Sequence, residues 1–233
     1  RITAVLPFFG YARQDRKDQP RVPITAKLIA NLLVAAGVNR VLAMDLHAQQ
    51  IQGFFDIPVD HLFCAPIFYR YIAEKKIPDL VVVTPDIGGM KMAAAYAQML
   101  NSGLAIVSKK RLNASETEST HLIGDVKDKN VLLVDDITET AGTISSAVEI
   151  LRRHGVKDIY VGIPHAVLGT TGLERLKKLG LKEFITTNTT PQENSPIPSK
   201  VLCVAPLLGQ AILRIHEGES VSSLFEIRAG VKT

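Results

Sequence analysis

The chain has 233 residues, of which 46% are hydrophobic, 21% charged and 6% aromatic, with 27 basic residues against 23 acidic ones. This apolar fraction can fill a core, so global disorder is excluded. The net charge of +4 is small, and the longest basic run, Lys109–Arg111, is shorter than nucleic-acid or anionic membrane surfaces usually need. No apolar stretch approaches the roughly 18 residues of a membrane span. We therefore expect neither a nucleic-acid partner nor a membrane partner.

The two cysteines, Cys64 and Cys203, lie far apart and neither belongs to a CxxC motif. This spacing excludes a disulfide scaffold and a cysteine-rich zinc site, and it favours a reducing compartment, so we predict a cytoplasmic protein. The sequence enters an apolar, strand-like run directly after Arg1, whereas a natural start more often has a polar lead-in. We expect an N-terminal portion to precede Arg1.

Strand-like and helix-like segments alternate along most of the chain. Gly37, Gly155 and Gly180 end three of the helices, and Thr25 is the expected cap of the first helix. In chain order, the expected elements are strand 2–6, helix 25–36, strand 40–44, helix 66–75, strand 80–84, helix 90–100, strands 104–108 and 131–134, helix 143–154, strand 159–163, helix 171–179, strands 184–187 and 201–204, and helix 207–215. Repeated strand–helix units predict parallel α/β sheets.

The length allows one large domain or two small ones, since a typical domain has about 150 residues. The expected seam is Phe55–Pro66, where Pro58 and Pro66 bracket a change of chain direction. Residues 1–60 are too few for a complete α/β domain. This agrees with a missing N-terminal portion.

Polar clusters follow five of the predicted strands. Ligand sites in parallel sheets lie at the carboxyl ends of strands, so these clusters mark where a site is expected. They are Arg13 with Gln14, Asp45 with His47, Asp86 with Gly88 and Gly89, Lys109 with Arg111, and the segment from Asp135 to Thr143.

The segment after strand Val131–Val134 is the most informative. Asp135 and Asp136 stand at the strand end, and the loop Glu139–Thr143 then opens a helix. A helix N-terminus and threonine hydroxyls suit an anion, and small residues let the backbone approach a phosphate. Carboxylates would repel a bare phosphate and suit sugar hydroxyls or a nearby metal. Together they predict a site for a phosphorylated sugar.

A plainer interpretation stays open at this point. Asp135 and Asp136 could merely cap the following helix, with Thr140–Thr143 an ordinary turn. A Walker loop is excluded, because no GxxxxGK[ST] motif occurs in the chain.

The segment Val131–Thr143 resembles the ribose-phosphate loop shared by type I phosphoribosyltransferases and ribose-phosphate pyrophosphokinases. Further segments resemble the pyrophosphokinases in particular, and the resemblance covers nearly the whole chain in the right order. They are Phe9–Arg16, Asp45–Phe55, Pro85–Gly89, Lys109–Arg111 and Ser220–Phe225.

This resemblance implies an α/β fold of two tandem type I phosphoribosyltransferase-like domains, with parallel sheets flanked by helices. The first domain would be partial, at residues 1–60 on the ATP side, and the second would comprise residues 61–206. Residues 207–233 would form a C-terminal helix and tail that pack back on the first domain. The family transfers the β,γ-diphosphoryl group of ATP to the C1 hydroxyl of ribose 5-phosphate, giving phosphoribosyl pyrophosphate and AMP for nucleotide biosynthesis.

The resemblance also implies a role for each matching residue. The 5-phosphate would be held by Glu139, Thr140, Ala141, Gly142 and Thr143, and the ribose hydroxyls by Asp135 and Asp136. Lys109 and Arg111 would be the catalytic residues of a mobile loop. Arg13, Gln14 and His47 would contact ATP, and His47 and Asp86 would be associated with Mg²⁺, which prefers oxygen ligands and would be held mainly by ATP phosphates.

The expected partners are therefore ATP, ribose 5-phosphate and further copies of the chain, in a homo-oligomer built from dimers with a hexamer as one arrangement. Glu139 departs from the aspartate usual in the family, and Met92 replaces a usual basic residue. Two alternatives stay open: a catalytically silent regulatory or sensing homologue, and a nucleobase phosphoribosyltransferase, which would share only the 135–143 loop.

Overall fold

Two main sheets divide the chain into two units. The computed structural model describes residues 1–110, 119–192 and 197–224, and for residues 109, 110, 119 and 120 it gives the backbone alone. One unit is Ala65–Val204, and the other joins Arg1–Cys64 to the segment that starts at Ala205. The border between residues 64 and 65 lies four residues after the one expected from the sequence, and the border between residues 204 and 205 lies two residues before the expected one.

A seven-stranded sheet forms the centre of the unit Ala65–Val204, in the order β12-β11-β9-β7-β4-β5-β6. All neighbouring strands are parallel except β5 and β6, which are antiparallel. The central strands are continuous apolar runs because helices bury both faces of the sheet. The strands are β4 (Leu80–Thr84), β5 (Gly103–Lys110), β6 (Ser119–Ile123), β7 (Asn130–Val134), β9 (Ile159–Gly162), β11 (Glu183–Thr187) and β12 (Ser199–Leu202).

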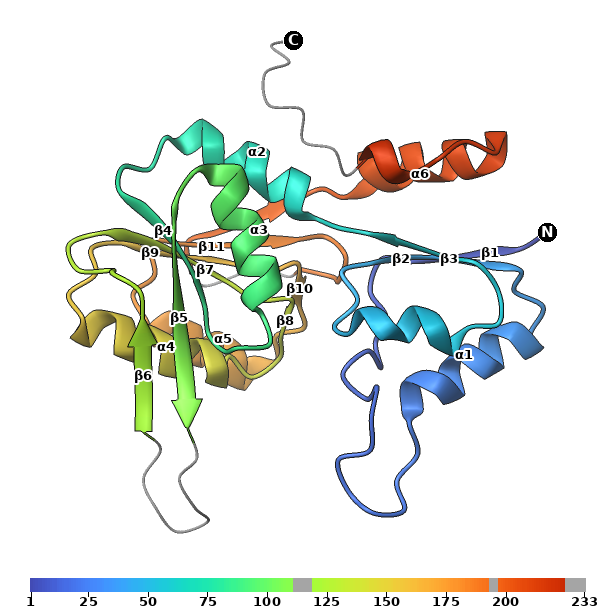
Figure 1. The fold of residues 1–233 in the computed structure, drawn as a ribbon, viewed down its shortest axis with the longest axis horizontal. Helices are drawn as coiled ribbons and strands as arrows, with labels where there is room; N and C mark the ends of the chain where they lie inside the picture. Colours follow the sequence, from blue (N-terminus) through green and yellow to red (C-terminus); the bar gives the residue numbers. More distant parts are fainter. Residues whose placement is uncertain (111–118, 193–196, 225–233) are drawn as a thin grey trace. The chain divides into compact units, whose positions relative to one another are not determined.

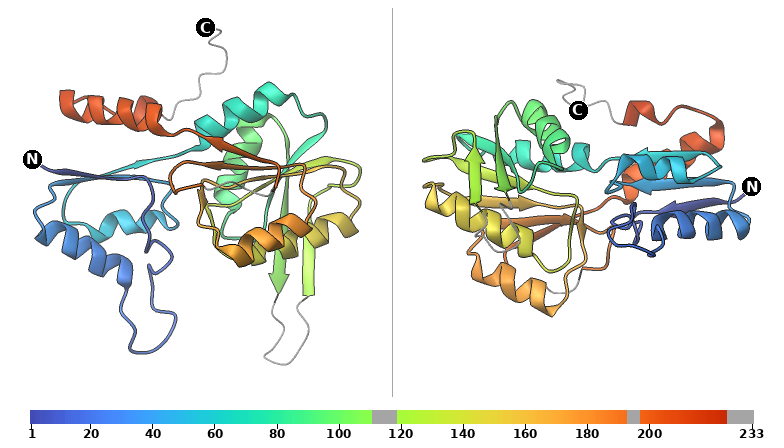
Figure 2. Two further views of the ribbon diagram at one scale, coloured as in Figure 1. Left: turned by 180° about the vertical axis from the view of Figure 1, so that it is seen from behind. Right: turned by 60° about the horizontal axis from the view of Figure 1, so that its bottom comes forward.

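Four helices cover this sheet, with α2 (Ala65–Lys75) and α3 (Met90–Leu100) on one face and α4 (Gly142–Arg153) and α5 (Thr170–Lys178) on the other (Figures 1 and 2). Helix α4 shows why the sequence folds this way. Its buried residues Ile144, Val148 and Leu151 recur at a helical period and join the core of the sheet.

A two-stranded parallel ribbon lies beside the large sheet, formed by β8 (Ile137–Thr138) and β10 (His165–Ala166). Because β8 separates the carboxylates Asp135 and Asp136 from the loop that opens α4, its partner β10 fixes the path of the chain at that point.

The other unit contains a three-stranded parallel sheet of β1 (Thr3–Leu6), β2 (Arg40–Met44) and β3 (Val59–Leu62), in that order. Helix α1 (Thr25–Ala35) buries Ala26 and Ala30 in a core shared with the 3₁₀ helix η1 (Gln49–Phe54). The unit also includes α6 (Ala205–Glu217) and η2 (Ser222–Leu224). None of the helices in the described ranges has the length and apolar run that crossing a bilayer requires.

Three sequence-based expectations are corrected here. Thr25 is the first residue of α1 and not its cap, because Ile24 holds the N-cap position without a side-chain hydrogen bond. The strand expected to end at Ser108 continues through Lys110, since Lys109 and Lys110 pair with β6. The expected seam Phe55–Pro66 also contains strand β3. The polar residues Asp60 and His61 interrupt its apolar run, so the sequence pattern did not indicate a strand there.

Candidate active site

The N-terminus of α4 lies where the sequence predicts a phosphate site. Ala141 is its N-cap in the left-handed conformation, with φ 55°. The N-cap residue makes no side-chain hydrogen bond to this helix, and the first turn of the helix holds no acidic residue. The first N–H groups of a helix have no intrahelical acceptor, and their partial positive charge favours an anion. Asp135 and Asp136 precede this N-cap by six and five residues, so neither holds the capping position that the plainer interpretation gave them.

Three carboxylates gather at the carboxyl ends of two neighbouring strands. Asp135 and Asp136 follow β7, and Asp86 follows β4, which pairs with β7. The backbone N–H of Asp136 donates to the Asp135 carboxylate over 3.0 Å. Burial, together with the negative charges of Asp136 and Asp86, raises the pKa of Asp135 well above its ordinary value of 3.8. Such a cluster favours hydroxyl donors or a cation, as a sugar with a bound metal would supply.

The loop after β4 is compact and held by its own polar groups. The Thr84 hydroxyl donates to the Asp86 carbonyl over 2.8 Å, and the Gly89 N–H donates to the Asp86 carboxylate over 3.0 Å. A side chain at Gly89 would collide with the Thr84 hydroxyl. This contact explains why glycine is needed before α3, where the sequence showed only a turn.

The loop Glu139–Thr143 is braced from behind by β10 and α5. The backbone N–H of His165 donates to the Asp136 carbonyl over 3.1 Å, and that of Val167 donates to the Thr138 carbonyl over 2.9 Å. The Arg175 guanidinium of α5 donates to the Thr140 carbonyl over 3.0 Å. The segment that leads into the loop is thus held by β10 and its neighbour Val167, and the loop itself is held by Arg175 of α5; both holding segments lie more than 20 residues further along the chain.

In the other unit, Arg13 and Gln14 lie in an exposed loop between β1 and α1, and His47 is exposed just after β2. These loops follow neighbouring parallel strands, so both leave the same edge of the sheet. The Gln50 amide donates to the Asp15 carboxylate over 3.1 Å and ties the two loops together. The structure therefore brings the three predicted ATP-contacting residues to one edge.

His61 holds the turn that presents His47. Its Nε2 accepts a hydrogen bond from the Leu46 N–H at 2.9 Å, and the Asp45 carboxylate accepts one from the Cys64 N–H at 2.8 Å. Burial lowers the pKa of His61 from 6.5 to about 4, so the ring is neutral at physiological pH and its Nε2 remains an acceptor.

The structure describes only one of the two predicted catalytic residues, Lys109, and for this residue the backbone alone. The backbone of Lys109 belongs to β5, and Arg111 lies outside the described residues. The proposed Mg²⁺ residues belong to different units, His47 to one and Asp86 to the other. Within the described ranges, the structure holds no group of three or more His, Cys, Asp or Glu side chains arranged to bind a metal ion on their own.

Sequence reasoning missed three residues that support these loops. They are His61, Arg175 and Gly172, where a Cβ atom would lie 2.5 Å from the Glu139 carbonyl oxygen. His61 sits in an unrecognised strand, and the other two lie on a helix that is distant in sequence from the loop it contacts. Only a signal for contact between distant segments could have found them.

A mainly parallel α/β sheet, with paired carboxylates ahead of an open helix N-terminus, defines a protein of the phosphoribosyltransferase class. Residues 63–193 match the family described as the phosphoribosyl transferase domain, and residues 1–37 match the N-terminal domain of ribose phosphate pyrophosphokinase.

Full-length relatives and a crystal structure narrow this class. The chain is 52% identical to a ribose-phosphate pyrophosphokinase of Gloeobacter violaceus, with 96% of this chain and 68% of the relative covered. It is also 52% identical to one of Caldanaerobacter subterraneus, with 96% and 72% covered. The crystal structure of phosphoribosylpyrophosphate synthetase from Mycobacterium smegmatis has a TM-score of 0.87 at 43% identity, covering 94% of this chain and 72% of that one. The chain belongs to the ribose-phosphate pyrophosphokinase family and is an enzyme of the diphosphotransferase class.

Proposed function

We propose that this protein transfers the β,γ-diphosphoryl group of ATP to the C1 hydroxyl of ribose 5-phosphate. The C1 oxygen bonds to the β-phosphorus, the bond from that phosphorus to the oxygen bridging the α- and β-phosphates breaks, and the hydroxyl proton is lost. The products are phosphoribosyl pyrophosphate and AMP. The single observation that carries this proposal is the open N-terminus of α4 with Asp135 and Asp136 directly ahead of it.

The two ends of the sugar phosphate find different partners in this arrangement. Backbone N–H groups of Gly142 and Thr143 and the threonine hydroxyls suit the 5-phosphate, with Glu139, Thr140 and Ala141 completing the loop. Asp135 and Asp136 suit the ribose hydroxyls, since carboxylates accept their hydrogen bonds. We assign ATP to Arg13, Gln14 and His47, because an arginine can pair with phosphate oxygens or stack on adenine.

Mg²⁺ fits the residues present. Burial, together with the negative charges of Asp136 and Asp86, raises the pKa of Asp135, and a nearby cation would relieve that like-charge repulsion. We assign the ion to His47 and Asp86 together with the ATP phosphates. When bound, it neutralises phosphate charge and orients the triphosphate.

Lys109 and Arg111 are proposed to bring positive charge to the diphosphoryl group during transfer. Phosphoryl transfer depends on positioning and charge neutralisation more than on covalent chemistry, so two cations beside that group would act on the transition state.

The proposal includes the organisation of the whole protein. We take residues 1–60 as the ATP side, residues 61–206 as the ribose 5-phosphate domain and residues 207–233 as the return to the first domain, within a cytoplasmic homo-oligomer. Both cysteines are free thiols, Cys64 buried and Cys203 exposed, which supports a reducing compartment.

One assay tests the proposed reaction. The protein is incubated with ATP, Mg²⁺ and ribose 5-phosphate, and AMP is measured, with unphosphorylated ribose as the control sugar. AMP that depends on ribose 5-phosphate supports the proposal, and AMP at background overturns it. Binding of ribose 5-phosphate without turnover would instead identify a catalytically silent homologue. A Lys109→Ala variant should lose kcat far more than sugar affinity, because the proposed contacts form in the transition state.

A further inference from the structure

Helix α5 approaches the loop Glu139–Thr143 as closely as backbone allows. A Cβ atom placed on Gly172 would lie 2.5 Å from the Glu139 carbonyl oxygen and 2.8 Å from Leu168 Cδ2. Real Cβ atoms do not come this close to a carbonyl oxygen, so a side chain at position 172 would push the helix and the loop apart. The loop and α5 therefore form one closely packed assembly.

Arg175 lies one turn further along α5. Its Nη1 donates to the Thr140 carbonyl over 3.0 Å and lies 3.5 Å from the position that a Cβ atom on Gly142 would take. The side chain is exposed, and a guanidinium has five N–H donors in a fixed fork. One donor holds the loop, which leaves others available to a ligand at the same place.

The charge of Arg175 is unusual at this position. The N-terminus of α4 already carries partial positive charge, so a cation beside it is unfavourable unless an anion lies between them. Arg175 also lies in the last turn of α5, where a cation is favourable, and this offsets part of the cost. A phosphate dianion at the loop would make both positive groups favourable at once.

We propose that Arg175 is a positioning residue for ribose 5-phosphate. Its hydrogen bond to Thr140 holds the peptide that precedes the N–H groups of Gly142 and Thr143, and its charge favours the 5-phosphate over a neutral group. The inference rests on the proposed function of the 139–143 loop. It assigns Arg175 to sugar-phosphate affinity and to neither ATP affinity nor the transfer step.

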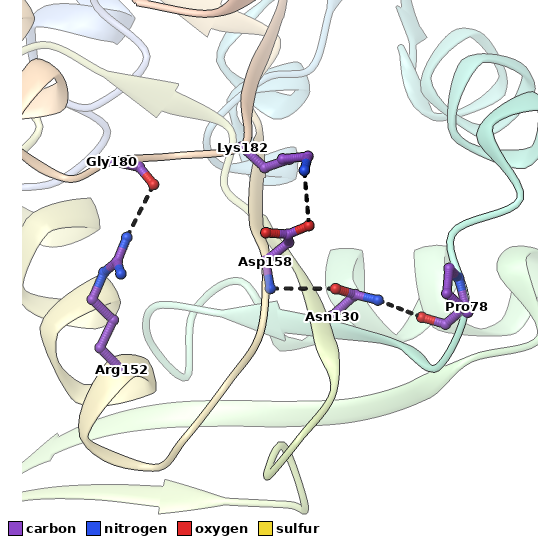
Figure 3. Close-up of polar contacts among 6 residues, drawn as sticks. All are labelled: Pro78, Asn130, Arg152, Asp158, Gly180 and Lys182. Carbon is purple, nitrogen blue, oxygen red and sulfur yellow. Dashed lines mark hydrogen bonds and ion pairs between the residues drawn. The ribbon is translucent and has the colours of Figure 1, made fainter.

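Arg152 offers a matched control within the same unit. It is also an exposed arginine that holds a distant turn through carbonyl groups, since its Nη2 donates to the Leu179 carbonyl over 2.6 Å. The same nitrogen donates to the Gly180 carbonyl over 3.0 Å (Figure 3). It lies at the last turn of α4, at the opposite end of the helix from the proposed phosphate site. Replacing Arg152 should lower the stability of the fold as replacing Arg175 does, but it should not change the affinity for the sugar phosphate.

The test compares Arg175→Met, Arg175→Lys and Arg152→Met by steady-state kinetics and thermal unfolding. We expect Arg175→Met to raise the KM for ribose 5-phosphate about 10- to 100-fold, the range for a charge-assisted hydrogen bond. Its KM for ATP and its kcat should change less than threefold. Arg175→Lys should recover part of the affinity, and Arg152→Met should alter only the unfolding temperature.

The proposal is overturned if Arg175→Met keeps its KM for ribose 5-phosphate within twofold of wild type, or if the KM for ATP rises by the same factor. Calorimetric titration of wild type and variants with ribose 5-phosphate, without ATP, keeps the test separate from turnover. An inactive wild type that binds the sugar phosphate through Arg175 would contradict the proposed reaction and support the role of Arg175.

Discussion

The two ends of the seven-stranded sheet contrast in how their polar groups are paired. At the amino ends, a series of contacts links the four neighbouring strands β11, β9, β7 and β4. Lys182 contacts Asp158, Asp158 contacts Asn130, and Asn130 contacts Pro78 (Figure 3). The Asn130 amide donates to the Pro78 carbonyl over 2.7 Å, its oxygen accepts from the Asp158 N–H at 3.3 Å, and Lys182 lies 3.1 Å from the Asp158 carboxylate. At this end the opposite charges of Lys182 and Asp158 lie beside each other.

At the carboxyl ends the balance is reversed. Burial and the like charges of Asp136 and Asp86 raise the pKa of Asp135, and Ala141, the N-cap of α4, is held in the left-handed conformation without a side-chain cap hydrogen bond. Like-charge repulsion and strained backbone destabilise the protein without ligand, but a bound phosphosugar and a metal can compensate them. The same sheet therefore contributes stability at one end and ligand affinity at the other, and substitutions at each end should separate the two quantities.

The largest expected effect is that of Asp135→Asn, which keeps the shape and the acceptor for the Asp136 N–H but removes the charge. We expect kcat/KM for ribose 5-phosphate to fall about 100-fold, because charged acceptors for the sugar hydroxyls are lost. The free energy of unfolding at neutral pH should rise by about 1 kcal/mol, since like-charge repulsion is relieved. Kinetics and thermal unfolding at pH 7 measure both.

The pH dependence of this stabilisation follows from the raised pKa of Asp135. Above pH 3.8, the native carboxyl holds its proton when the unfolded one has lost it, so the wild type loses stability as pH rises towards the native pKa. The advantage of Asp135→Asn should therefore be absent below about pH 4 and grow as pH rises above it. An advantage that shrank over that range would contradict the repulsion at this end.

Gly172→Ala tests the close packing behind the phosphate loop. The added Cβ would meet the Glu139 carbonyl, and we expect a loss of about 1–3 kcal/mol in the free energy of unfolding with a higher KM for ribose 5-phosphate. Gly209→Ala in α6 is the control, because nothing lies within 4 Å of its Cβ position. That helix substitution should stabilise by about 0.5–1 kcal/mol. Equal effects of the two substitutions would show that α5 does not approach the loop as closely as described.

Asn130→Ala tests the amino ends. Asn130 is buried, and the Pro78 carbonyl and the Asp158 N–H would each lose a partly buried hydrogen bond, so we expect a loss of about 1–2 kcal/mol in the free energy of unfolding. The activity of the folded enzyme should stay within twofold of wild type. Denaturant unfolding measures the stability of the variant, and kinetic assays measure its activity. A large loss of turnover in a stable variant would show that the two ends of the sheet are not independent.

Lys182→Gln should have the smallest effect. Its ion pair with Asp158 is about half exposed on both sides, and such pairs contribute roughly 0.5 kcal/mol or less and are screened by salt. Unfolding of wild type and variant at low and high salt should show a difference in stability between them that disappears near 1 M salt. A difference that persisted there would indicate that the Lys182 stem stabilises the sheet through packing.

Much of the fold could be predicted because the central strands are buried on both faces. The expected bounds of strands Arg40–Met44 and Leu80–Thr84 and of helix Met90–Leu100 match the structure. Continuous branched apolar runs and a helical period identify such elements without knowledge of their neighbours. Strands β3 and β6 were missed, because one carries Asp60 and His61 and the other begins with Ser119 and Thr120.

The features of the candidate site also fall into two groups, those set by adjacent residues and those set by tertiary contacts. The sequence by itself determined the strand that ends at Asp135 and Asp136 and the small residues at the start of α4, and it predicted a phosphosugar there, because these features depend on residues adjacent in the chain. Only the tertiary structure decided that Asp86 raises the pKa of Asp135, that β10 and Arg175 brace the loop, and that His61 holds the turn before His47. These depend on strand order and helix packing, which bring together residues that no local pattern relates.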